Sequence, residues 1–194
     1  MKYEIVELPK NKWKHTPIYI KYTTNEYYDL EINESKELFD IKMEKKRFLS
    51  LVTHSPEEYD YPDRLYQDFW EEAKAYGIVI DNNGKEELLA CVEVWPEEWS
   101  NRLRITILWV DDYIQSQGVG TMLMNYVKEI ARLQNRRAII LETQSCNVKA
   151  IDFYRKQGFE LIGFDKCCYT NNDIERCEFR LEFGYFLNRN PDRR

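Results

Sequence analysis

The segment Ile105–Gly120, ITILWVDDYIQSQGVG, joins an apolar strand to a glycine-containing turn, and residues 121–135 after it have helical periodicity. The first N–H groups of a helix have no intrahelical partner, and the helix dipole adds roughly half a positive charge at that end. Gly118 and Gly120 have no Cβ, which lets a bulky diphosphate approach the backbone. We therefore expect an anion-binding turn here, although the spacing Gln115-x-x-Gly118-x-Gly120 alone is also typical of an ordinary tight turn.

The segments that follow the turn make the pattern more specific. Ala138–Thr143 (AIILET) indicates a second buried strand, Asn147–Tyr154 (NVKAIDFY) begins a second helix, and Gly158-Phe159 ends it. Over residues 103–164 this order resembles the acyl-CoA-binding core of the GNAT acetyltransferase superfamily. The LETQ sequence at Leu141–Gln144 makes the resemblance greatest to the streptothricin acetyltransferase-like branch.

The resemblance implies an α/β fold of the α+β kind. Its central sheet is mixed but mostly antiparallel, splays after the fourth core strand and is flanked by helices. A chain of 194 residues suits one domain. We expect a single GNAT domain over residues 1–194, with an acceptor-side half (1–100) and an acyl-CoA-binding core with C-terminal strands (101–187).

Local signals predict further elements. Asn82-Asn83-Gly84 is typical of a hairpin turn, and Pro62–Tyr76 places apolar residues at helical spacing before the stop at Gly77. The polar tail, residues 188–194, is expected to fray. The other predicted strands are Ile18–Ile32 (a strand or hairpin), Ile78–Asp81, Leu88–Val94, Arg102–Val110, Leu161–Tyr169 and Arg176–Phe186.

The charge balance bears on the partners. With 28 basic and 34 acidic residues the net charge is −6, which disfavours a nucleic-acid partner. A mildly acidic body suits a cationic amine substrate, but many proteins carry such a charge for solubility alone.

The cellular compartment can be predicted from the cysteines, the histidines and the length of the apolar runs. The five cysteines form no C-x-x-C pair, and the two histidines stand in the N-terminal part, so we expect neither a disulfide framework nor a metal site. No run approaches the roughly twenty apolar residues of a membrane span, and the first residues lack the apolar core of a signal peptide. These observations predict a cytoplasmic protein with no membrane partner.

The resemblance implies that acetyl-CoA is the cosubstrate and that no metal takes part. Asn147 has two interpretations, because it is placed to cap the second helix and also matches a residue that contacts the pantetheine arm in relatives. Phe153 is explained at least as well by core packing. The residues that the resemblance assigns to acyl-CoA are Leu108, Trp109, Val110, Gln115, Ser116, Gln117, Gly118, Val119, Gly120, Thr121, Asn147, Ala150 and Phe153.

Tyr154 is the predicted general acid. If an amine attacks the thioester directly, the departing thiolate needs a proton donor, and a tyrosine with a pKa near 10 stays protonated at neutral pH. Relatives use a tyrosine at this position. The alternative is a buried tyrosine that only packs its ring against the sheet.

The general base is left open by the sequence. Many relatives carry an acidic residue on the strand before the glycine turn, but that strand here has no carboxylate before Asp111. Glu142, within LETQ, and Glu93, on the preceding hairpin, are the candidates, and a water-filled channel without a single base is also possible. Two more carboxylates, Glu97 and Glu98, stand beside tryptophans and could rim an acceptor pocket.

Cys146 lies next to the predicted thioester site, where a thiolate could form an acyl-enzyme. No histidine is close to it in the sequence, and the superfamily usually transfers directly, so we expect a passive side chain.

Together these features predict an acetyl-CoA-dependent N-acetyltransferase that acts on a primary amine of a small molecule by direct transfer. A streptothricin-like aminoacyl antibiotic, and hence antibiotic resistance, is the specific hypothesis, and the family resemblance allows a homodimer. The alternatives are acetylation of a protein or peptide amine, and a regulatory module that binds acyl-CoA without catalysis. A dinucleotide-binding Rossmann unit is disfavoured, because antiparallel strands precede the glycine turn.

Overall fold

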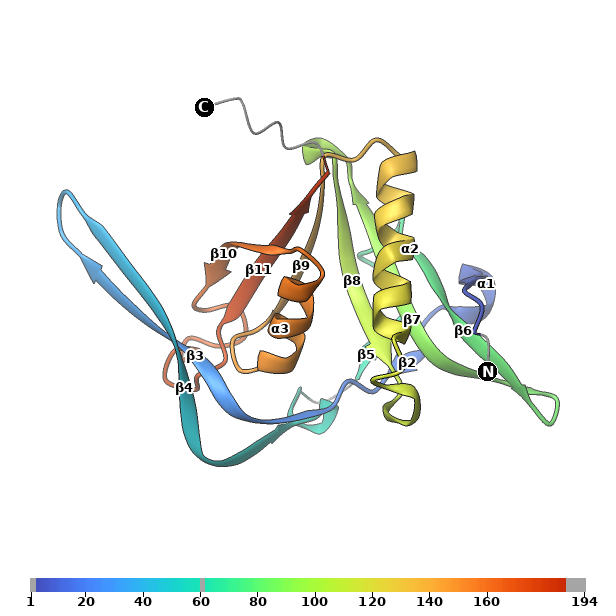
Figure 1. Ribbon diagram of the computed structural model, residues 1–194, viewed down its shortest axis with the longest axis horizontal. Helices are drawn as coiled ribbons and strands as arrows, with labels where there is room; N and C mark the ends of the chain where they lie inside the picture. Colours follow the sequence, from blue (N-terminus) through green and yellow to red (C-terminus); the bar gives the residue numbers. More distant parts are fainter. Residues whose placement is uncertain (1–2, 60–61, 188–194) are drawn as a thin grey trace. The chain divides into compact units, whose positions relative to one another are not determined.

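The computed structural model describes residues 3–59 and 62–187 (Figure 1). The chain divides into two compact units that each combine separate stretches of sequence. The first unit comprises Met1–Ile20, Pro56–Leu141 and Gly184–Arg194, and the second comprises Lys21–Ser55 and Glu142–Phe183. The C-terminal residues 188–194, predicted to fray, lie outside the described part.

The main sheet has seven strands in the order β1-β6-β7-β8-β9-β11-β10. The antiparallel pairs are β1 with β6, β6 with β7 and β7 with β8, whereas β8 and β9 are parallel. The mixed, mostly antiparallel sheet that the sequence predicts is thereby confirmed. The strands are β1 (Val6–Leu8), β6 (Lys74–Asn82), β7 (Lys85–Glu97), β8 (Arg102–Val110), β9 (Ala138–Gln144), β10 (Glu160–Asp165) and β11 (Arg180–Phe186); the helices are α1 (Lys10–Trp13), α2 (Val119–Leu133) and α3 (Val148–Lys156).

The parallel pairing of β8 is short. It runs from Arg102↔Ala138 to Arg104↔Ile140, while β8 itself continues to Val110. Within the described residues, the stretch 105–110 is therefore paired on its β7 side only. This is the loss of pairing expected for a sheet that splays after β8.

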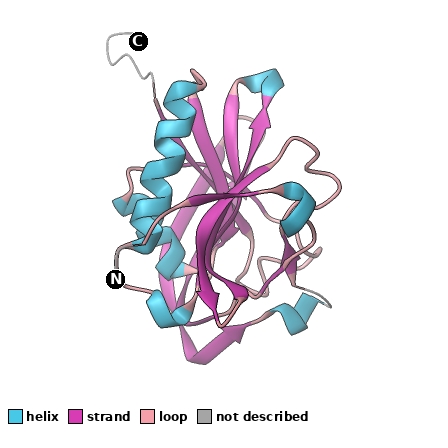
Figure 2. Cartoon of the chain, turned by 90° about the vertical axis from the view of Figure 1, so that its right-hand side faces the viewer, coloured by secondary structure: helices cyan, strands magenta, loops and turns pink. Residues whose placement is uncertain are grey.

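Helix α2 covers one face of the sheet in the first unit (Figure 2). Its buried residues recur at a spacing of three to four, which places them on a single stripe against β7 and β8. Each of the larger side chains contributes about 1.5–3 kcal/mol when it leaves water, and the single methyl group of alanine contributes less. They are Val119, Leu123, Met124, Val127 and Ala131.

A second apolar cluster lies in the same unit and draws on the N-terminal segment, the loop before β6 and strands β7 and β8. Its most buried members include Leu8, Leu65 and Tyr66, and Trp70, Trp95 and Trp109 are half-buried against it. The sheet of the first unit is thus packed by two separate apolar clusters.

The segment Pro62–Tyr76, predicted as a helix, forms none. It consists of the short strand β5 (Asp63–Arg64), turns, and the start of β6, and β5 pairs with β2 (Pro17–Ile18). Tyr66 has a left-handed backbone with φ 56°, and Leu65 exchanges backbone hydrogen bonds with His15 and Thr16. Tertiary hydrogen bonds therefore override the helical spacing of the apolar residues.

The second unit contains a long two-stranded arm, β3 (Tyr22–Glu34) and β4 (Phe39–His54), in the N-terminal colours of Figure 1. The sequence predicts a strand or hairpin only as far as Ile32, and β4 falls in a stretch without a clear period. The arm carries the exposed apolar side chains Leu38, Phe39, Ile41, Leu49 and Leu51.

The predicted turn Asn82-Asn83-Gly84 is confirmed. Asn83 and Gly84 have φ 55° and 82°, and Asn82 pairs with Lys85, as expected for a two-residue hairpin loop. The strand Arg102–Val110 and the helices after the glycine turn and after Asn147 are confirmed as well. The two C-terminal strands are shorter than predicted, because residues 166–179 form an irregular loop.

We expect Gly77→Ala to destabilise the protein. A Cβ at this site in β6 would lie 2.5 Å from the backbone oxygen of Ala90, so a paired strand would have to move. Overpacking of this kind costs about 1–3 kcal/mol, which urea denaturation followed by circular dichroism measures.

Gly163→Ala is the matched control, because its added Cβ would make only an ordinary contact of 3.6 Å with Glu182. Equal unfolding midpoints for the two variants would contradict the close approach at Gly77.

Candidate active site

The turn between β8 and α2 is shaped by its own side chains. Asp111 accepts a hydrogen bond from the backbone N–H of Tyr113 at 2.8 Å. Gln115 donates to the backbone oxygen of Val110 at 3.1 Å and to Asp112 at 2.6 Å. Ser116 and Gly118 have φ 63° and 82°. These bonds hold the turn in place before any ligand arrives.

The start of α2 is open on the ligand side. Gly118 caps the helix with no side-chain hydrogen bond, and a Cβ added to it would meet nothing within 4 Å. The first turn of a helix in this state offers backbone N–H groups to an anion. The geometry therefore fits the predicted diphosphate site.

The predicted residues of this turn contribute through the backbone more than through side chains. The side chain of Gln117 bonds Tyr113 and Tyr3, and that of Val119 is buried. Leu108, Trp109 and Val110, at the end of β8, are half-buried, and their strand is unpaired on one side.

In the second unit, Asn147 caps helix α3, since its Oδ1 accepts a hydrogen bond from the N–H of Ala150 at 3.3 Å. The capping interpretation is confirmed, and the pantetheine contact stays a prediction. Phe153 is half-buried and packs edge-on against Tyr154, with ring centroids 5.6 Å apart.

Tyr154 lies in an aromatic environment. Its ring packs near Phe153, Phe159 and Phe183, and burial raises its pKa to about 12. Its hydroxyl makes no hydrogen bond to any residue that the structure describes. The group is protonated at neutral pH and available to a ligand.

Glu93, in the first unit, is a buried carboxylate with two hydrogen-bond donors. Its Oε2 accepts from the backbone N–H of Tyr66 at 2.5 Å and its Oε1 from the hydroxyl of Thr106 at 2.7 Å. The register of β7 and β8 shifts here, which leaves Thr106 as a bulge residue. Burial raises the pKa of Glu93, and these two hydrogen bonds oppose the rise without cancelling it.

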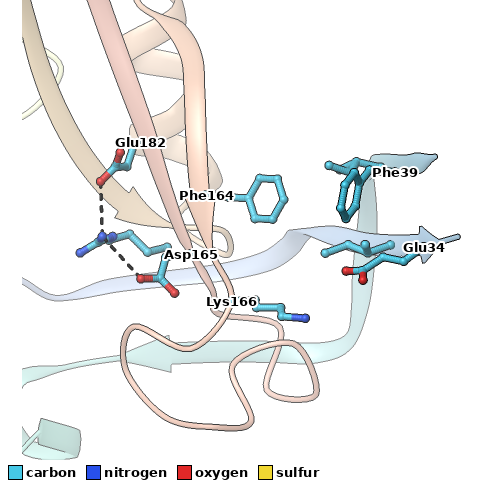
Figure 3. A pocket seen from close by; sticks show the side chains of 9 residues that line it. Glu34, Phe39, Phe164, Asp165, Lys166 and Glu182 are labelled. Atoms are coloured by element: carbon cyan, nitrogen blue, oxygen red, sulfur yellow. Dashed lines mark ion pairs between the residues drawn. The ribbon is translucent and has the colours of Figure 1, made fainter. Parts of the chain in front are cut away.

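Glu142, the other candidate base, is exposed and forms an ion pair with Arg180 at 3.5 Å. Arg180 also pairs with Asp165 and Glu182 at the wall of an open pocket of about 430 Å³ in the second unit (Figure 3). Glu142 is engaged by a guanidinium at an exposed site, whereas Glu93 is buried and burial raises its pKa. The surroundings thus favour Glu93 over Glu142 as the base.

Glu97 and Glu98, expected beside an acceptor pocket, are both engaged in ion pairs, and their place at such a pocket stays a prediction. Glu97 is buried and pairs with Arg102 and Arg104, and Glu98 pairs with Arg136 at 2.6 Å. Both precede the first residue of β8, at the strand end opposite the turn. Their role is to hold this corner of the first unit together.

Cys146 has a histidine neighbour that the sequence does not reveal, because the two residues are 92 positions apart. His54 Nε2 lies 3.5 Å from Cys146 Sγ, and Nδ1 of the same ring lies 3.7 Å from Glu178. All three side chains are buried, and burial raises the pKa of the thiol to about 11. The alignment resembles a catalytic triad, but the thiol is protonated and inaccessible, as a passive side chain would be.

The described residues contain neither a metal-binding cluster nor a membrane-spanning helix. Among residues 3–59 and 62–187 no group of His, Cys, Asp or Glu is arranged to hold a metal ion. In the same residues no helix has the length and apolar character needed to cross a membrane.

The fold and the uncapped glycine turn are those of an acyltransferase that uses a CoA thioester, and comparison with known proteins agrees. The family model "Acetyltransferase (GNAT) family" matches residues 36–159. A streptothricin acetyltransferase of Escherichia coli is 32% identical over 158 residues, which are 81% of this chain and 87% of that protein.

Solved structures show the same fold over nearly the whole chain. A nourseothricin acetyltransferase superimposes with a TM-score of 0.71 at 19% identity, covering 96% of this chain and 99% of that one. A protein of Bacillus anthracis str. Ames, solved with acetyl coenzyme A, gives 0.69 at 22% identity, covering 97% and 100%. The chain belongs to the GNAT acetyltransferase family and is an acetyl-CoA-dependent N-acetyltransferase.

We expect Gly118→Ala to weaken CoA binding about tenfold or more, since a methyl group would stand where the diphosphate approaches the backbone. Isothermal titration calorimetry with CoA measures the effect.

Gly84→Ala is the control, because Gly84 has the same φ of 82° and equally open surroundings, so that both variants carry the same backbone strain. If both variants bind CoA like the wild type, the turn does not hold the diphosphate.

Proposed function

We propose that the enzyme transfers the acetyl group directly from acetyl-CoA to a primary amine of a small molecule, with a streptothricin-like aminoacyl antibiotic as the leading acceptor. The observation that carries the proposal is Glu93, a buried carboxylate with a raised pKa beside a bulge in β8. The printed name of the Escherichia coli relative supports the antibiotic, and with it a role in resistance.

Acetyl-CoA would be held by two backbone surfaces of the first unit. The unpaired edge of β8, residues 105–110, offers N–H and C=O groups to the pantetheine arm in the way a strand accepts another. The N–H groups between Gln115 and Thr121 face the diphosphate. In this proposal Asn147, Ala150 and Phe153 are the residues of α3 and its N-cap that would contact the pantetheine arm.

Glu93 takes the proton that the ammonium form of the acceptor must lose. A raised pKa brings a carboxylate closer to the working pH, which makes it a better base than an ordinary glutamate. Glu93 has no exposed surface, but Thr106 is half-buried and bonds its carboxylate, so the hydroxyl, which both donates and accepts, can relay the proton from the acceptor to Glu93.

The neutral amine nitrogen then forms a bond to the thioester carbon, and the C–S bond breaks to release CoA as a thiolate. The nitrogen still carries one proton more than the neutral amide and loses it to solvent. A thiol has a reference pKa of about 8.5, well below the pKa of about 12 for Tyr154. Complete transfer of the tyrosine proton to the thiolate is therefore uphill. We propose that Tyr154 stabilises the departing sulfur by donating a hydrogen bond.

Two alternative functions differ from this proposal in what an assay would detect. A protein or peptide amine would use the same chemistry with a larger acceptor, whereas a regulatory module would bind acyl-CoA and release no thiol. The presence of both Glu93 and Tyr154 favours catalysis, and the coverage of 87% of a small-molecule acetyltransferase favours a small acceptor.

We further propose that the chain works as one acetyltransferase domain in the cytoplasm, which its five free cysteines favour. A homodimer is part of the proposal, with the exposed apolar residues of the arm as its contact surface. The net charge of −6 gives no reason to add a nucleic-acid partner.

We expect Glu93→Gln to lower kcat/KM by about 10²–10³ because the amide cannot accept the proton. The acidic limb of the pH–rate profile, which rises as Glu93 loses its proton above the ordinary pKa of a glutamate, should flatten in the variant. Release of free thiol, followed with a chromogenic disulfide, measures both effects.

Glu142→Gln supplies the comparison, since it removes the other candidate carboxylate at an exposed site. A larger loss in Glu142→Gln than in Glu93→Gln would reverse the assignment of the base.

We expect Tyr154→Phe to lower kcat by about 10–10² while the Kd of CoA stays unchanged, because only the hydroxyl that meets the thiolate is lost. Phe159→Leu is the control for ring packing in the same aromatic group. Unchanged turnover in Tyr154→Phe would remove the hydroxyl from the mechanism.

A further inference from the structure

The loop Pro62–Ala73 contacts strand β7 at two points in the first unit. Tyr66 donates its backbone N–H to Glu93, and Trp70 packs against Trp95 with ring centroids 5.0 Å apart. Glu93 and Trp95 are two residues apart on one strand and therefore project to the same face, about 6.6 Å apart along it. An aromatic surface thus adjoins the proposed base.

We define the aromatic surface as Phe69, Trp70 and Trp95. Its tryptophan rings are only partly buried in the apolar cluster of the first unit. Leu65 and Tyr66 of the same loop are buried and fill the apolar cluster beneath it. Trp70 and Trp95 remain half-exposed, and Phe69 is 67% exposed. Large aromatic rings left in contact with water next to a buried carboxylate are typical of a binding surface.

The rings are tilted against one another. The planes of Trp70 and Trp95 make an angle of 51°, and those of Phe69 and Trp70 an angle of 60° at 5.2 Å. Ring faces, where the negative part of the quadrupole lies, attract cations.

The charge of the loop points to the same ligand chemistry. It carries Asp63, Asp68, Glu71 and Glu72 against Arg64, a net charge of −4 + 1 = −3. Asp68 is paired with Lys14, but Asp63, Glu71 and Glu72 form no ion pair with a described residue. Lys10 donates to the backbone oxygen of Glu71, and with Lys10 and Lys14 counted the net charge around the loop is −3 + 2 = −1. The carboxylates of Asp63, Glu71 and Glu72 are therefore the groups that can face a cationic ligand beside the aromatic surface.

The reacting amine cannot be the group that this surface holds. In the proposed reaction that amine gives its proton to Glu93 and becomes neutral before it attacks, so it loses its attraction to the rings and carboxylates. If the aromatic surface stays bound to the acceptor throughout the reaction, it must bind a second group of the acceptor that remains cationic.

We propose that Trp70 and Trp95, with Phe69 at their edge, bind a second ammonium group of the acceptor while Glu93 receives the proton of the first. The inference rests on the proposed function and narrows its substrate class to diamines and polyamines. The spacing of about 6.6 Å between Glu93 and Trp95 along β7 sets the length scale, and we choose a linker of roughly four to five methylene groups between the nitrogens on that basis.

The test compares 1,5-diaminopentane with n-pentylamine, which has the same chain and one charge fewer. We expect the wild type to prefer the diamine about tenfold or more in kcat/KM, a difference of about 1.4 kcal/mol. Trp70→Leu and Trp95→Leu should remove the preference by raising KM of the diamine, with kcat largely retained. Trp95→Phe, which keeps an aromatic face, should restore part of it.

Trp99→Leu is the matched control, because Trp99 is 82% exposed, lies in the turn between β7 and β8 and packs over Arg102 rather than against Trp70 or Trp95. Circular dichroism and CoA binding establish that each variant is folded. A diamine preference that survives in both Trp70→Leu and Trp95→Leu, or that falls equally in Trp99→Leu, would overturn the proposal.

A second measurement separates this inference from the enzymatic function. The bis(trimethylammonium) derivative of pentane cannot be acetylated, and its binding is followed by tryptophan fluorescence without acetyl-CoA. Saturable binding that is lost in Trp70→Leu supports the surface even if no amine is turned over. Turnover that depends on Glu93, combined with no binding of this probe and no diamine preference, would reject the surface and leave the function intact.

Discussion

The carboxylate of Glu93 is the constraint on which the first unit depends. A carboxylate with no exposed surface costs several kcal/mol unless donors meet its oxygens, and Tyr66 and Thr106 supply them. Tyr66 donates from a left-handed backbone conformation, and Thr106 lies in the bulge of β8 beside β7. One buried charge therefore fixes the path of a loop, the register of two strands and the place of an aromatic surface.

Strand β8 links this constraint to the cosubstrate. One edge pairs with β7 over nearly its whole length and carries the bulge, while the other pairs with β9 for only three residue pairs. The free edge and the glycine turn beyond it are continuous backbone, so in the proposed binding mode a ligand along the strand would place its anionic end at the start of α2. The same strand can in this way position a thioester and the hydroxyl that bonds Glu93. A mutation in β8 should for this reason affect cosubstrate and acceptor kinetics together.

The parts of the fold that the sequence predicts are those specified by local signals. The hairpin at Asn83-Gly84 needs two left-handed residues, α2 has a single buried stripe, and Asn147 caps α3 in the manner its side chain favours. The loop at residues 62–73 was predicted wrongly, because Leu65, Phe69, Trp70 and Ala73 have helical spacing although hydrogen bonds to a distant strand decide their conformation. Glu93 could be named from the sequence as one of two bases. Its donors, and hence the reason to prefer it, depend on contacts between residues far apart in the chain.

Burial decides the roles of the remaining reactive groups. Cys146, His54 and Glu178 align as a nucleophile, base and orienting acid would, at 3.5 and 3.7 Å. A thiol with a pKa of about 11 is ionised in only about one molecule in 10⁴ at pH 7, however, whereas nucleophilic cysteines have a lowered pKa and partial exposure. The hydroxyl of Tyr22 also contacts the sulfur and bonds Gln144, so the group ties the base of the arm to the segment before α3. The sulfur thus acts as a small packing atom in a polar network, and direct transfer to the amine needs no covalent step through it.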